Sequence, residues 1–342
     1  MIPTPERLLE LVDRLEGQPV LMVVDPVADC FVHGVPKRIS REAPVLILRW
    51  TGEDVAPGGG ANAAANVRAL GGVPLPVGCI GDDAAGDALR SAFESLGIAT
   101  GGLVVRHGWP TPKKTRILAG FPTGIKQQVV RYDREEMRPL DATESREIRE
   151  RIAAYGGRAG VAVLSDYGYG AVVPELMPAV REALGGGTVL VDSRFRLGEF
   201  RGVEGATPNE EEAEALLDRP FDAHEIREDA GRMMRDRLGA RFVLVTRGSH
   251  GMELFTPEGH ALVPVHGSDQ VADVTGAGDT VIGAFALAFA AGATPLEAAL
   301  LANYAGGVVV MKIGTATATR EELVEAIRND PAPVERTRWA AS

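Results

Sequence analysis

The sequence has little of what several protein classes require. It holds two cysteines, Cys30 and Cys79, which is too few for a disulfide framework or a cysteine metal site. Its longest apolar run, Val281 to Ala293, is too short to span a bilayer as a helix. A net charge of −11 disfavours binding to nucleic acid or to an anionic membrane. We therefore expect a globular protein whose partners are small molecules, without nucleic acid or membrane among them.

Some nucleotide-binding motifs are also missing. The sequence has no Gly-x-x-x-x-Gly-Lys-Ser/Thr, which excludes a P-loop enzyme, and no protein-kinase His-Arg-Asp set. A Rossmann dehydrogenase is disfavoured because no Gly-x-Gly-x-x-Gly follows the first predicted strand. The opening residues 1–16 are amphipathic and charged rather than typical of a signal peptide. With the few cysteines, this indicates a cytoplasmic location.

Strands and helices are expected to alternate along most of the chain. Apolar runs such as Val20–Val24 and Phe242–Val245 are typical of strands that are buried on both faces. The alternation predicts an α/β fold, a doubly wound and mostly parallel sheet with helices on both faces. Two β-rich segments, about 31–50 and 107–133, predict a small β lid outside that sheet, and the second segment predicts a hairpin of Thr115–Ala119 with Gln128–Tyr132. We expect residues 1–330 to form one domain and residues 331–342 a C-terminal tail.

Polar residues follow several of the predicted strands, where open parallel sheets bind ligands. Asp25 and Asp29 follow the first strand, and Asp166 follows another apolar run. Turn chemistry explains such residues equally well. The glycines of Pro57-Gly58-Gly59-Gly60 would let a ligand approach the backbone, and the residues alone suggest that Asn62, just after them, caps a helix.

The most informative motif is Asp273-Val274-Thr275-Gly276-Ala277-Gly278-Asp279-Thr280. Two glycines one residue apart suit a tight turn with backbone N–H groups pointing into a cavity. The apolar helix predicted to follow carries free N–H groups and a partial positive charge at its start, so it favours an anion. Asp279 is either a simple helix-start acid or a catalytic base beside this anion site, and the spacing leaves both interpretations open.

This motif resembles the C-terminal signature of the ribokinase-like (PfkB) sugar kinases, and other landmarks follow in the family's order over residues 20–327. The resemblance implies transfer of a phosphoryl group from ATP to a sugar hydroxyl, with Mg²⁺. Asp279 would take the proton from the hydroxyl. The N–H groups of Gly276, Ala277 and Gly278 would meet the developing negative charge.

The resemblance also implies ligand contacts elsewhere. Thr207-Pro208-Asn209-Glu210-Glu211-Glu212 matches a family motif in which the residues equivalent to Asn209 and Glu212 organise water and Mg²⁺ around the nucleotide phosphates. Sequence alone favours a helix cap and a solvated first turn for them. The other implied residues are, for the sugar, Asp29, Gly58, Gly59, Asn62 and Asp166; for the nucleotide, Thr246, Gly248, Gly251 and Asn303; and for a monovalent cation such as K⁺, Asp273 and Thr275.

One segment narrows the resemblance. Arg38-Ile39-Ser40-Arg41-Glu42-Ala43-Pro44-Val45 closely resembles the bacterial heptose 7-phosphate kinases, which implies D-glycero-D-manno-heptose 7-phosphate, phosphorylated at O1. Tyr169 stands where that subfamily commonly has a lysine, and Ser193-Arg194 stands where it usually has Pro-Lys. Arg194 would partly compensate for the lost lysines as a cation. The alternatives are another PfkB-family sugar or nucleoside kinase, and a catalytically silent regulator that binds a sugar or a nucleotide.

Residues 101–131 contain six Lys or Arg and no Asp or Glu, in an otherwise acidic chain. A solvated surface is the usual explanation, but a sugar phosphate also requires cations, and Arg binds phosphate with two hydrogen bonds. We hypothesise that Arg38, Lys114, Arg116 or Arg131 binds the phosphate that the substrate already carries. Exposed lid strands favour pairing with a second subunit, so we expect a homodimer through the β lid.

Overall fold

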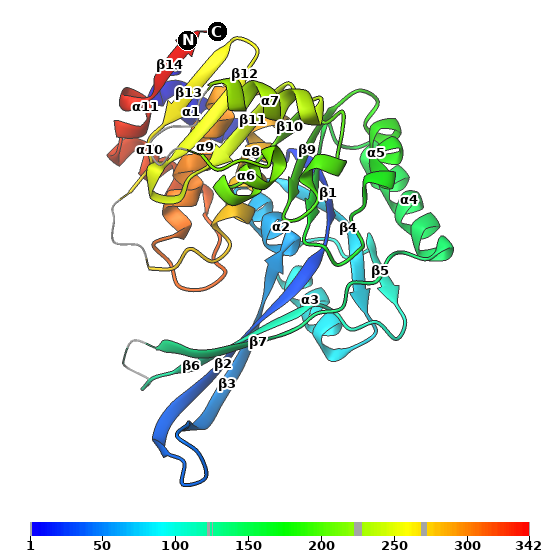
Figure 1. The fold of residues 1–342 in the computed structure, drawn as a ribbon, viewed down its shortest axis with the longest axis vertical. Helices are drawn as coiled ribbons and strands as arrows, with labels where there is room; N and C mark the ends of the chain where they lie inside the picture. The colour runs from blue at the N-terminus through cyan, green and yellow to red at the C-terminus, as the bar shows by residue number, and fades with distance from the viewer. Residues whose placement is uncertain (1, 122–123, 125, 222–227, 268–271, 342) are drawn as a thin grey trace.

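The computed structural model describes residues 2–121, 124, 126–221, 228–267 and 272–341. A ten-stranded sheet forms its centre, in the order β14-β13-β12-β11-β10-β9-β8-β1-β4-β5 (Figure 1). The strands from β5 to β11 pair in parallel, and β12, β13 and β14 are antiparallel at one edge. This confirms the predicted doubly wound, mostly parallel sheet. The strands are β1 (Pro19–Val24), β4 (Val73–Gly81), β5 (Leu103–Arg106), β8 (Val161–Asp166), β9 (Thr188–Ser193), β10 (Gly205–Ala206), β11 (Phe242–Thr246), β12 (Met252–Thr256), β13 (Gly259–Val263) and β14 (Arg338–Ala341).

Helices cover both faces of the sheet, and β1 shows why. Its side chains alternate, so that Val20 and Met22 join one buried cluster while Leu21 and Val23 join the other. None of the helices that the structure describes is long and apolar enough to cross a membrane. The helices are α1 (Pro5–Arg14), α2 (Gly60–Ala69), α3 (Ala84–Ser95), α4 (Ala142–Gly156), η1 (Pro174–Leu176), α5 (Met177–Leu184), η2 (Leu197–Glu199), α6 (Glu210–Leu217), α7 (Glu228–Leu238), η3 (Gly248–His250), α8 (Ala277–Ala290), α9 (Pro295–Val309), α10 (Arg320–Asn329) and α11 (Ala332–Arg336).

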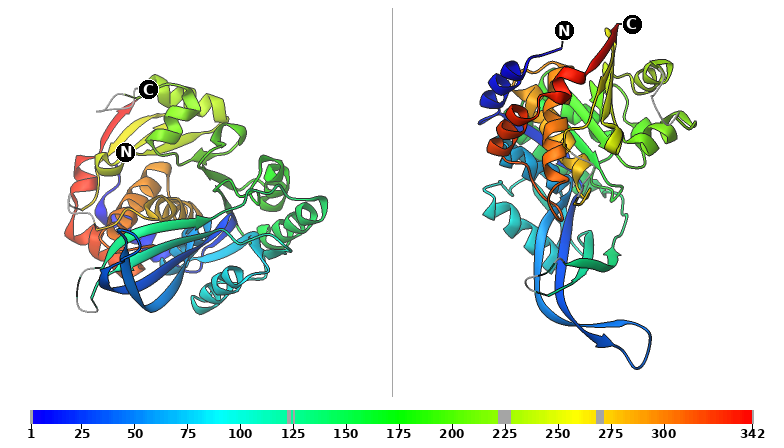
Figure 2. Two further views of the ribbon diagram at one scale, coloured as in Figure 1. Left: turned by 60° about the horizontal axis from the view of Figure 1, so that its bottom comes forward. Right: turned by 90° about the vertical axis from the view of Figure 1, so that its left-hand side faces the viewer.

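A second sheet of four strands, the lid, projects from the body (Figures 1 and 2). Its order is β3-β2-β6-β7, with β2 parallel to β6 and the other pairs antiparallel. The predicted hairpin is confirmed as β6 and β7, although Pro122 and Thr123 of its turn lie outside the described residues. The lid strands are β2 (Pro26–Ile39), β3 (Leu46–Gly59), β6 (Lys113–Ala119) and β7 (Gln127–Arg134).

The lid begins closer to the main sheet than the predicted segments 31–50 and 107–133. Pro26 pairs with Gly59, so β2 starts directly after β1 and β3 continues to the start of α2. Asp29, Gly58 and Gly59, which we expected in loops, therefore lie in lid strands. The Asp-Pro and Gly-rich sequences suggested turns because local chemistry does not reveal a pairing between segments some 30 residues apart.

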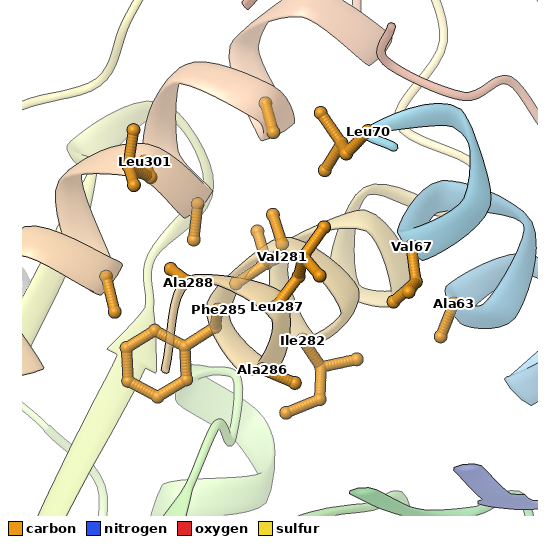
Figure 3. Packing of buried hydrophobic residues seen from close by; sticks show 14 of the residues in the cluster. Ala63, Val67, Leu70, Val281, Ile282, Phe285, Ala286, Leu287, Ala288 and Leu301 are labelled. Carbon is orange, nitrogen blue, oxygen red and sulfur yellow. The ribbon is translucent and has the colours of Figure 1, made fainter. Parts of the chain in front are cut away.

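Helix α8 lies between α2 and α9 and is buried along most of its length (Figure 3). The labelled side chains of Ala63 and Val67 on α2, and of Leu70 just after it, belong to the same buried cluster as Ile282 and its neighbours on α8 (Figure 3). Because α2 is rich in small residues, its backbone approaches α8 closely. This packing brings the start of α2, with Asn62, beside the start of α8, with Asp279.

Within the described residues, the predicted C-terminal tail forms a helix and a strand. Residues Ala332–Arg336 form α11, and β14 pairs with β13 at the edge of the main sheet. A strand of four residues has too few positions for an alternating pattern to be visible in the sequence. The folded unit therefore continues beyond residue 330.

Candidate active site

The carboxyl ends of parallel strands gather polar groups at one edge of the main sheet. Asp25 follows β1, Asp166 ends β8, Asp192 lies near the end of β9 and Thr246 ends β11. The start of α8, with Asp279, lies at the same edge, because Tyr167 after β8 bonds to Asp279. In open α/β sheets this edge is where ligands bind. Several of the residues singled out in the sequence therefore meet around one region of the molecule.

Asp279 is buried in the first turn of α8 and is held by both carboxylate oxygens. The Tyr167 hydroxyl donates to Oδ1 at 2.6 Å, and the amide of Asn62 donates to Oδ2 at 3.3 Å. Burial raises the pKa of Asp279 to about 7, although these two hydrogen bonds oppose the rise. A carboxylate with a pKa near neutrality is suited to accept a proton from a hydroxyl.

The glycine turn before α8 is shaped around Asn62. Gly276 has a positive φ of +77°, and a Cβ there would lie 2.4 Å from Nδ2 of Asn62, so both the backbone and the contact require glycine. Ala277 N–H donates to Val274 O, so one of the three predicted anion-binding N–H groups is engaged. Within the described residues, the N–H groups of Gly276 and Gly278 have no hydrogen-bond partner and remain free for an anion.

Asp29 is buried on β2 with both oxygens bonded. Arg116 donates to Oδ1 at 2.8 Å and Thr315 donates to Oδ2 at 2.6 Å. A Cβ on Gly58 would lie 2.6 Å from Oδ2 of Asp29, which accounts for glycine on the paired strand. Arg116, a candidate for phosphate binding, is thus paired with Asp29. No pattern in the sequence indicated the contact between Thr315 and Asp29, which lie 286 positions apart.

A cavity of about 340 Å³, which we call the cationic cavity, lies between the lid and the end of β8. Lys114, Arg131 and Arg194 line it, together with the acids Asp133 and Glu135 and the rings of Tyr167 and Tyr169. Arg131 is paired with Asp133, at 2.6 Å. Among the described residues, Lys114 and Arg194 have no hydrogen-bond or ion-pair partner and contact aromatic rings instead. Burial, aided by the nearby charge of Arg194, lowers the pKa of Lys114.

Arg38 lies far from this cavity. It is exposed near the end of β2, nine residues beyond Asp29, which is about 30 Å at the usual rise of a strand. Among the described residues, its guanidinium donates a hydrogen bond only to the carbonyl of Ile39, at 3.5 Å. Of the four cations considered for the substrate's phosphate, the structure therefore brings Lys114 and Arg131 to one cavity, pairs Arg116 with Asp29 and leaves Arg38 outside.

Asp25 and Asp166 hold loops at the edge of the sheet. Asp25 accepts three backbone N–H groups from residues 167–171, and burial together with Asp166 raises its pKa to about 6. Asp166 accepts hydrogen bonds from Gly168 N–H, from the Ser193 hydroxyl and from Arg196, at 2.7 to 3.3 Å. Asp166 also lines the neighbouring cavity. These hydrogen bonds explain the presence of both carboxylates at these positions without a bound ligand.

A larger cavity of about 650 Å³, which we call the acidic cavity, is lined by Asp192, Glu211, Glu212, Thr246 and Gly278, among others. Tyr167 and Arg194 line both cavities and so mark where they adjoin. Asn209 and Glu212 form a reciprocal capping box at the start of α6, with both hydrogen bonds at 2.9 Å. The cap expected from the sequence is confirmed, and one oxygen of Glu212 is left for a ligand.

Asp192 was missed in the sequence, although it lies at a strand end like Asp166. Burial, followed by the charge of Glu212, raises the pKa of Asp192 well above its usual value, and burial also raises the pKa of Glu212. A divalent cation would relieve this repulsion, so the pair fits Mg²⁺. In the part of the chain that the structure describes, no group of three or more metal-ligating side chains occurs. Mg²⁺ held here would keep water and phosphate oxygens as its other ligands.

Of the other residues predicted to bind the nucleotide, one lines the acidic cavity and three do not. Thr246 lines the acidic cavity. Gly248 and Gly251 lie in the turn between antiparallel β11 and β12, so this loop connects two strands. Neither glycine lines that cavity. Asn303 is buried in α9, where its amide donates to Pro264 O at 3.0 Å. Its contact is with the chain itself.

Asp273 joins two loops beside the glycine turn. Its oxygens accept the N–H groups of Thr275 at 2.9 Å and Gly314 at 3.0 Å. Burial acts to raise the pKa of Asp273, but these hydrogen bonds outweigh it and hold the pKa below its usual value. The carboxylate therefore keeps its negative charge, a charge that a monovalent cation would complement.

Comparisons with known proteins agree with this arrangement. The chain matches the pfkB family carbohydrate kinase over residues 32–156 and 197–322. The bifunctional protein HldE of Mesorhizobium japonicum is 42% identical over 337 residues, which is 97% of this chain and 66% of that protein. HldE of Paramagnetospirillum magneticum is 38% identical over 328 residues, 94% of this chain and 66% of that protein. This chain thus spans about 66% of the length of these relatives.

Solved structures share the fold. Phosphofructokinase-2 of Escherichia coli, in complex with substrates and products, superposes with a TM-score of 0.73 at 21% identity, over 92% of this chain and 99% of that one. Arabidopsis thaliana ribokinase, complexed with ribose and ATP, gives 0.70 at 22% identity, over 91% and 99%. The family match covers more than half of this sequence, and the HldE relatives exceed 30% identity. The chain belongs to the pfkB family of carbohydrate kinases.

Proposed function

We propose that this sugar kinase transfers the γ-phosphoryl group of ATP to O1 of D-glycero-D-manno-heptose 7-phosphate. The proposal rests on one observation. The cationic and acidic cavities adjoin at Tyr167 and Arg194, and Tyr167 bonds to Asp279. A phosphorylated sugar in the first cavity and a nucleotide in the second would thus approach each other beside a buried carboxylate.

The charges of the cationic cavity favour a sugar that already carries a phosphate. The side chains of Lys114 and Arg194 donate no hydrogen bond to any described residue. Both cations are therefore available to bind the phosphate dianion of a sugar phosphate. Arg194 replaces a subfamily lysine with a bidentate donor. The resemblance of residues 38–45 to heptose 7-phosphate kinases selects the heptose among phosphorylated sugars. Another pfkB-family sugar or nucleoside kinase is the second candidate.

In the proposed reaction the sugar hydroxyl attacks the γ-phosphorus as Asp279 takes its proton, and ADP leaves. The free N–H groups of Gly276 and Gly278 face the charge that develops on the transferring oxygens. Asp192 and Glu212 would hold Mg²⁺, which neutralises charge on the nucleotide phosphates when bound. Asp273 would stabilise a monovalent cation such as K⁺ beside the turn, and E. coli phosphofructokinase-2 has been solved in complex with potassium.

We also infer a cytoplasmic homodimer that forms through the lid. Several large apolar side chains of the lid are exposed, with Trp50 at 65% and Tyr132 at 58%. Edge strands β3 and β7 offer unpaired backbone groups. An apolar sheet that projects from the body is unusual in a monomer, and a second copy of the same lid would cover it.

The test is Mg-ATP turnover with heptose 7-phosphate beside free heptose, other sugar phosphates, free sugars and nucleosides. We expect turnover with heptose 7-phosphate and at least tenfold lower kcat/KM with free heptose. Turnover with another member of the panel alone would keep the kinase and refute the heptose. ATP binding without turnover of any member would support the silent regulator instead.

A further inference from the structure

Tyr167 occupies a position that the general family chemistry does not explain. It directly follows β8, and its backbone N–H donates to Oδ2 of Asp25 at 3.0 Å. Its hydroxyl donates to Oδ1 of Asp279 at 2.6 Å. The side chain lines both cavities and is partly buried. A phenol anchored by its own backbone thus reaches the catalytic carboxylate from the neighbouring strand.

The two hydrogen bonds to Asp279 differ in length. Tyr167 bonds to Oδ1 at 2.6 Å, whereas Asn62 bonds to Oδ2 at 3.3 Å, near the limit for a hydrogen bond. Asn62 has a further acceptor in Gly276 O, also at 3.3 Å. The short bond therefore ties down one oxygen, and the long bond leaves the other more available to a proton.

The ring of Tyr167 also contacts the cationic cavity. The Lys114 ammonium lies 5.3 Å from the centre of the ring, within the range of a cation–π interaction. Lys114 forms no hydrogen bond or ion pair with a described residue, although the charges of Asp29 and Glu135 act on it. A phosphate that drew Lys114 towards itself would therefore change the contact on the same ring whose hydroxyl holds the base.

We propose that Tyr167 is a positioning residue that fixes Oδ1 of Asp279, leaves Oδ2 to receive the proton of the sugar hydroxyl, and links this arrangement to Lys114 in the cationic cavity. The proposal rests on the proposed function, since it assigns Asp279 as the base. It makes Oδ2 the proton acceptor, with the long Asn62 bond giving way to the sugar hydroxyl.

The groups around Asp279 determine how the pH dependence responds. Asn62 on α2, Asp29 on β2, Lys114 on β6 and Tyr167 after β8 face this carboxyl. Asp192 on β9 acts on Tyr167, and Asp279 acts on Asp192 in turn. The Tyr167 hydrogen bond stabilises the ionised form of Asp279, so it lowers the carboxyl's pKa. Its loss would raise that pKa further.

The experiment compares Tyr167→Phe with Tyr304→Phe across pH, using Mg-ATP and the sugar that the panel identifies. Tyr304 on α9 is a matched control because its hydroxyl donates to the carbonyl of Asp330 and it lines neither cavity. For Tyr167→Phe we expect the acid limb of kcat/KM to move up by about one pH unit. We also expect kcat at neutral pH to fall about tenfold, with a smaller change in KM. The acid limb of Tyr304→Phe should stay in place.

An acid limb that does not move in a folded Tyr167→Phe protein would overturn the proposal. If that variant fails to fold, 3-fluorotyrosine at position 167 serves instead, since it keeps the ring and makes the hydroxyl a stronger donor. The acid limb should then move to lower pH, and an unchanged limb would again refute the proposal. Asp279→Asn distinguishes failure of the proposed base from failure of the proposed role of Tyr167. Its full activity would refute the base itself, whereas its inactivity beside an unmoved limb would refute only the role of Tyr167.

Discussion

The two cavities that adjoin at Tyr167 differ in charge, although they are neighbours. Lys114 and Arg131 line only the smaller of the two, beside Asp133 and Glu135, whereas Asp192 and Glu212 line only the larger one, and Arg194 lines both. Lys114 and Arg131 come from the lid, whereas the two acids of the larger cavity come from the end of β9 and the start of α6. Three cations thus gather around one cavity of a protein whose net charge is −11, so the charge of a site does not follow from the charge of the whole chain.

The same contrast explains why some charges are paired and others are free. Arg116 bonds to Asp29 and Arg196 bonds to Asp166, and each pair positions a carboxylate or a loop. Lys114 and Arg194 lack such partners among the described residues. Buried and half-buried charges without partners are costly unless a ligand completes them. We therefore expect the free charges to govern binding and the paired ones to govern structure.

Substitution of Asp279, which lines neither cavity, should give the largest loss of activity. Asp279→Asn keeps the shape of the side chain but cannot take a proton, so kcat should fall by about 10²- to 10⁴-fold. Asp87→Asn is the matched control, since Asp87 is also an acid in the first turn of a helix but is exposed. Turnover is measured under saturating Mg-ATP. Full activity of Asp279→Asn would remove the base from the mechanism.

The acidic cavity can be tested through its dependence on magnesium. In Asp192→Asn and Glu212→Gln, we expect the Mg²⁺ concentration for half-maximal activity to rise by about 10- to 100-fold, because each variant loses a carboxylate that faces the cation. Glu258→Gln, in the exposed turn after β12, removes the same charge elsewhere. Activity is followed during Mg²⁺ titration. If the Mg²⁺ concentration for half-maximal activity is unchanged in both cavity variants, Asp192 and Glu212 do not bind the metal.

The cationic cavity should respond through the sugar. Lys114→Met keeps the length and apolar stem of the side chain and removes its charge, so KM for a sugar phosphate should rise by about tenfold, the value of one hydrogen bond to a charged group. KM for the unphosphorylated sugar should change little. Lys37→Met, on an exposed part of β2, is the control. Equal changes for both sugars would show that Lys114 does not bind the phosphate.

The lid surface is expected to have the smallest effect on chemistry. Trp50→Ser should weaken dimerisation by about tenfold or more, because aromatic side chains dominate interface energies, while kcat of the remaining protein stays within about threefold. Met233→Ser replaces an apolar residue on α7, at 43% exposure, as control. The oligomeric state is measured by light scattering over a range of concentrations. A wild-type monomer at all concentrations would contradict the lid dimer.

Local patterns predicted much of this molecule. The alternation of apolar runs and helices indicated the parallel sheet, and the hairpin of β6 and β7 was visible in the sequence. The glycine turn marked the start of α8, and Asn209 with Glu212 formed the expected cap. Each of these features depends on residues close together in the chain, where propensity and capping are informative.

Features made by distant segments were not visible. Thr315 bonds to Asp29 across 286 positions, and Tyr167 bonds to Asp279 across 112. Arg116 looked like a free cation until its pairing with Asp29, 87 positions away, was known. The positions of these contacts follow from how β2, β6 and α8 pack, and a single sequence holds no signal for that packing.

The continuous strands of the lid have a mechanical consequence. β2 leaves the body at Pro26, and Asp29 lies three residues from that root while Ile39 lies thirteen from it. At the rise of a strand these are about 10 Å and 43 Å, so any swing about the root is reduced roughly fourfold at Asp29. The lid therefore acts as a lever with Asp29 close to its pivot, so that a large displacement of the lid tip becomes a small displacement of the Asp29 carboxylate.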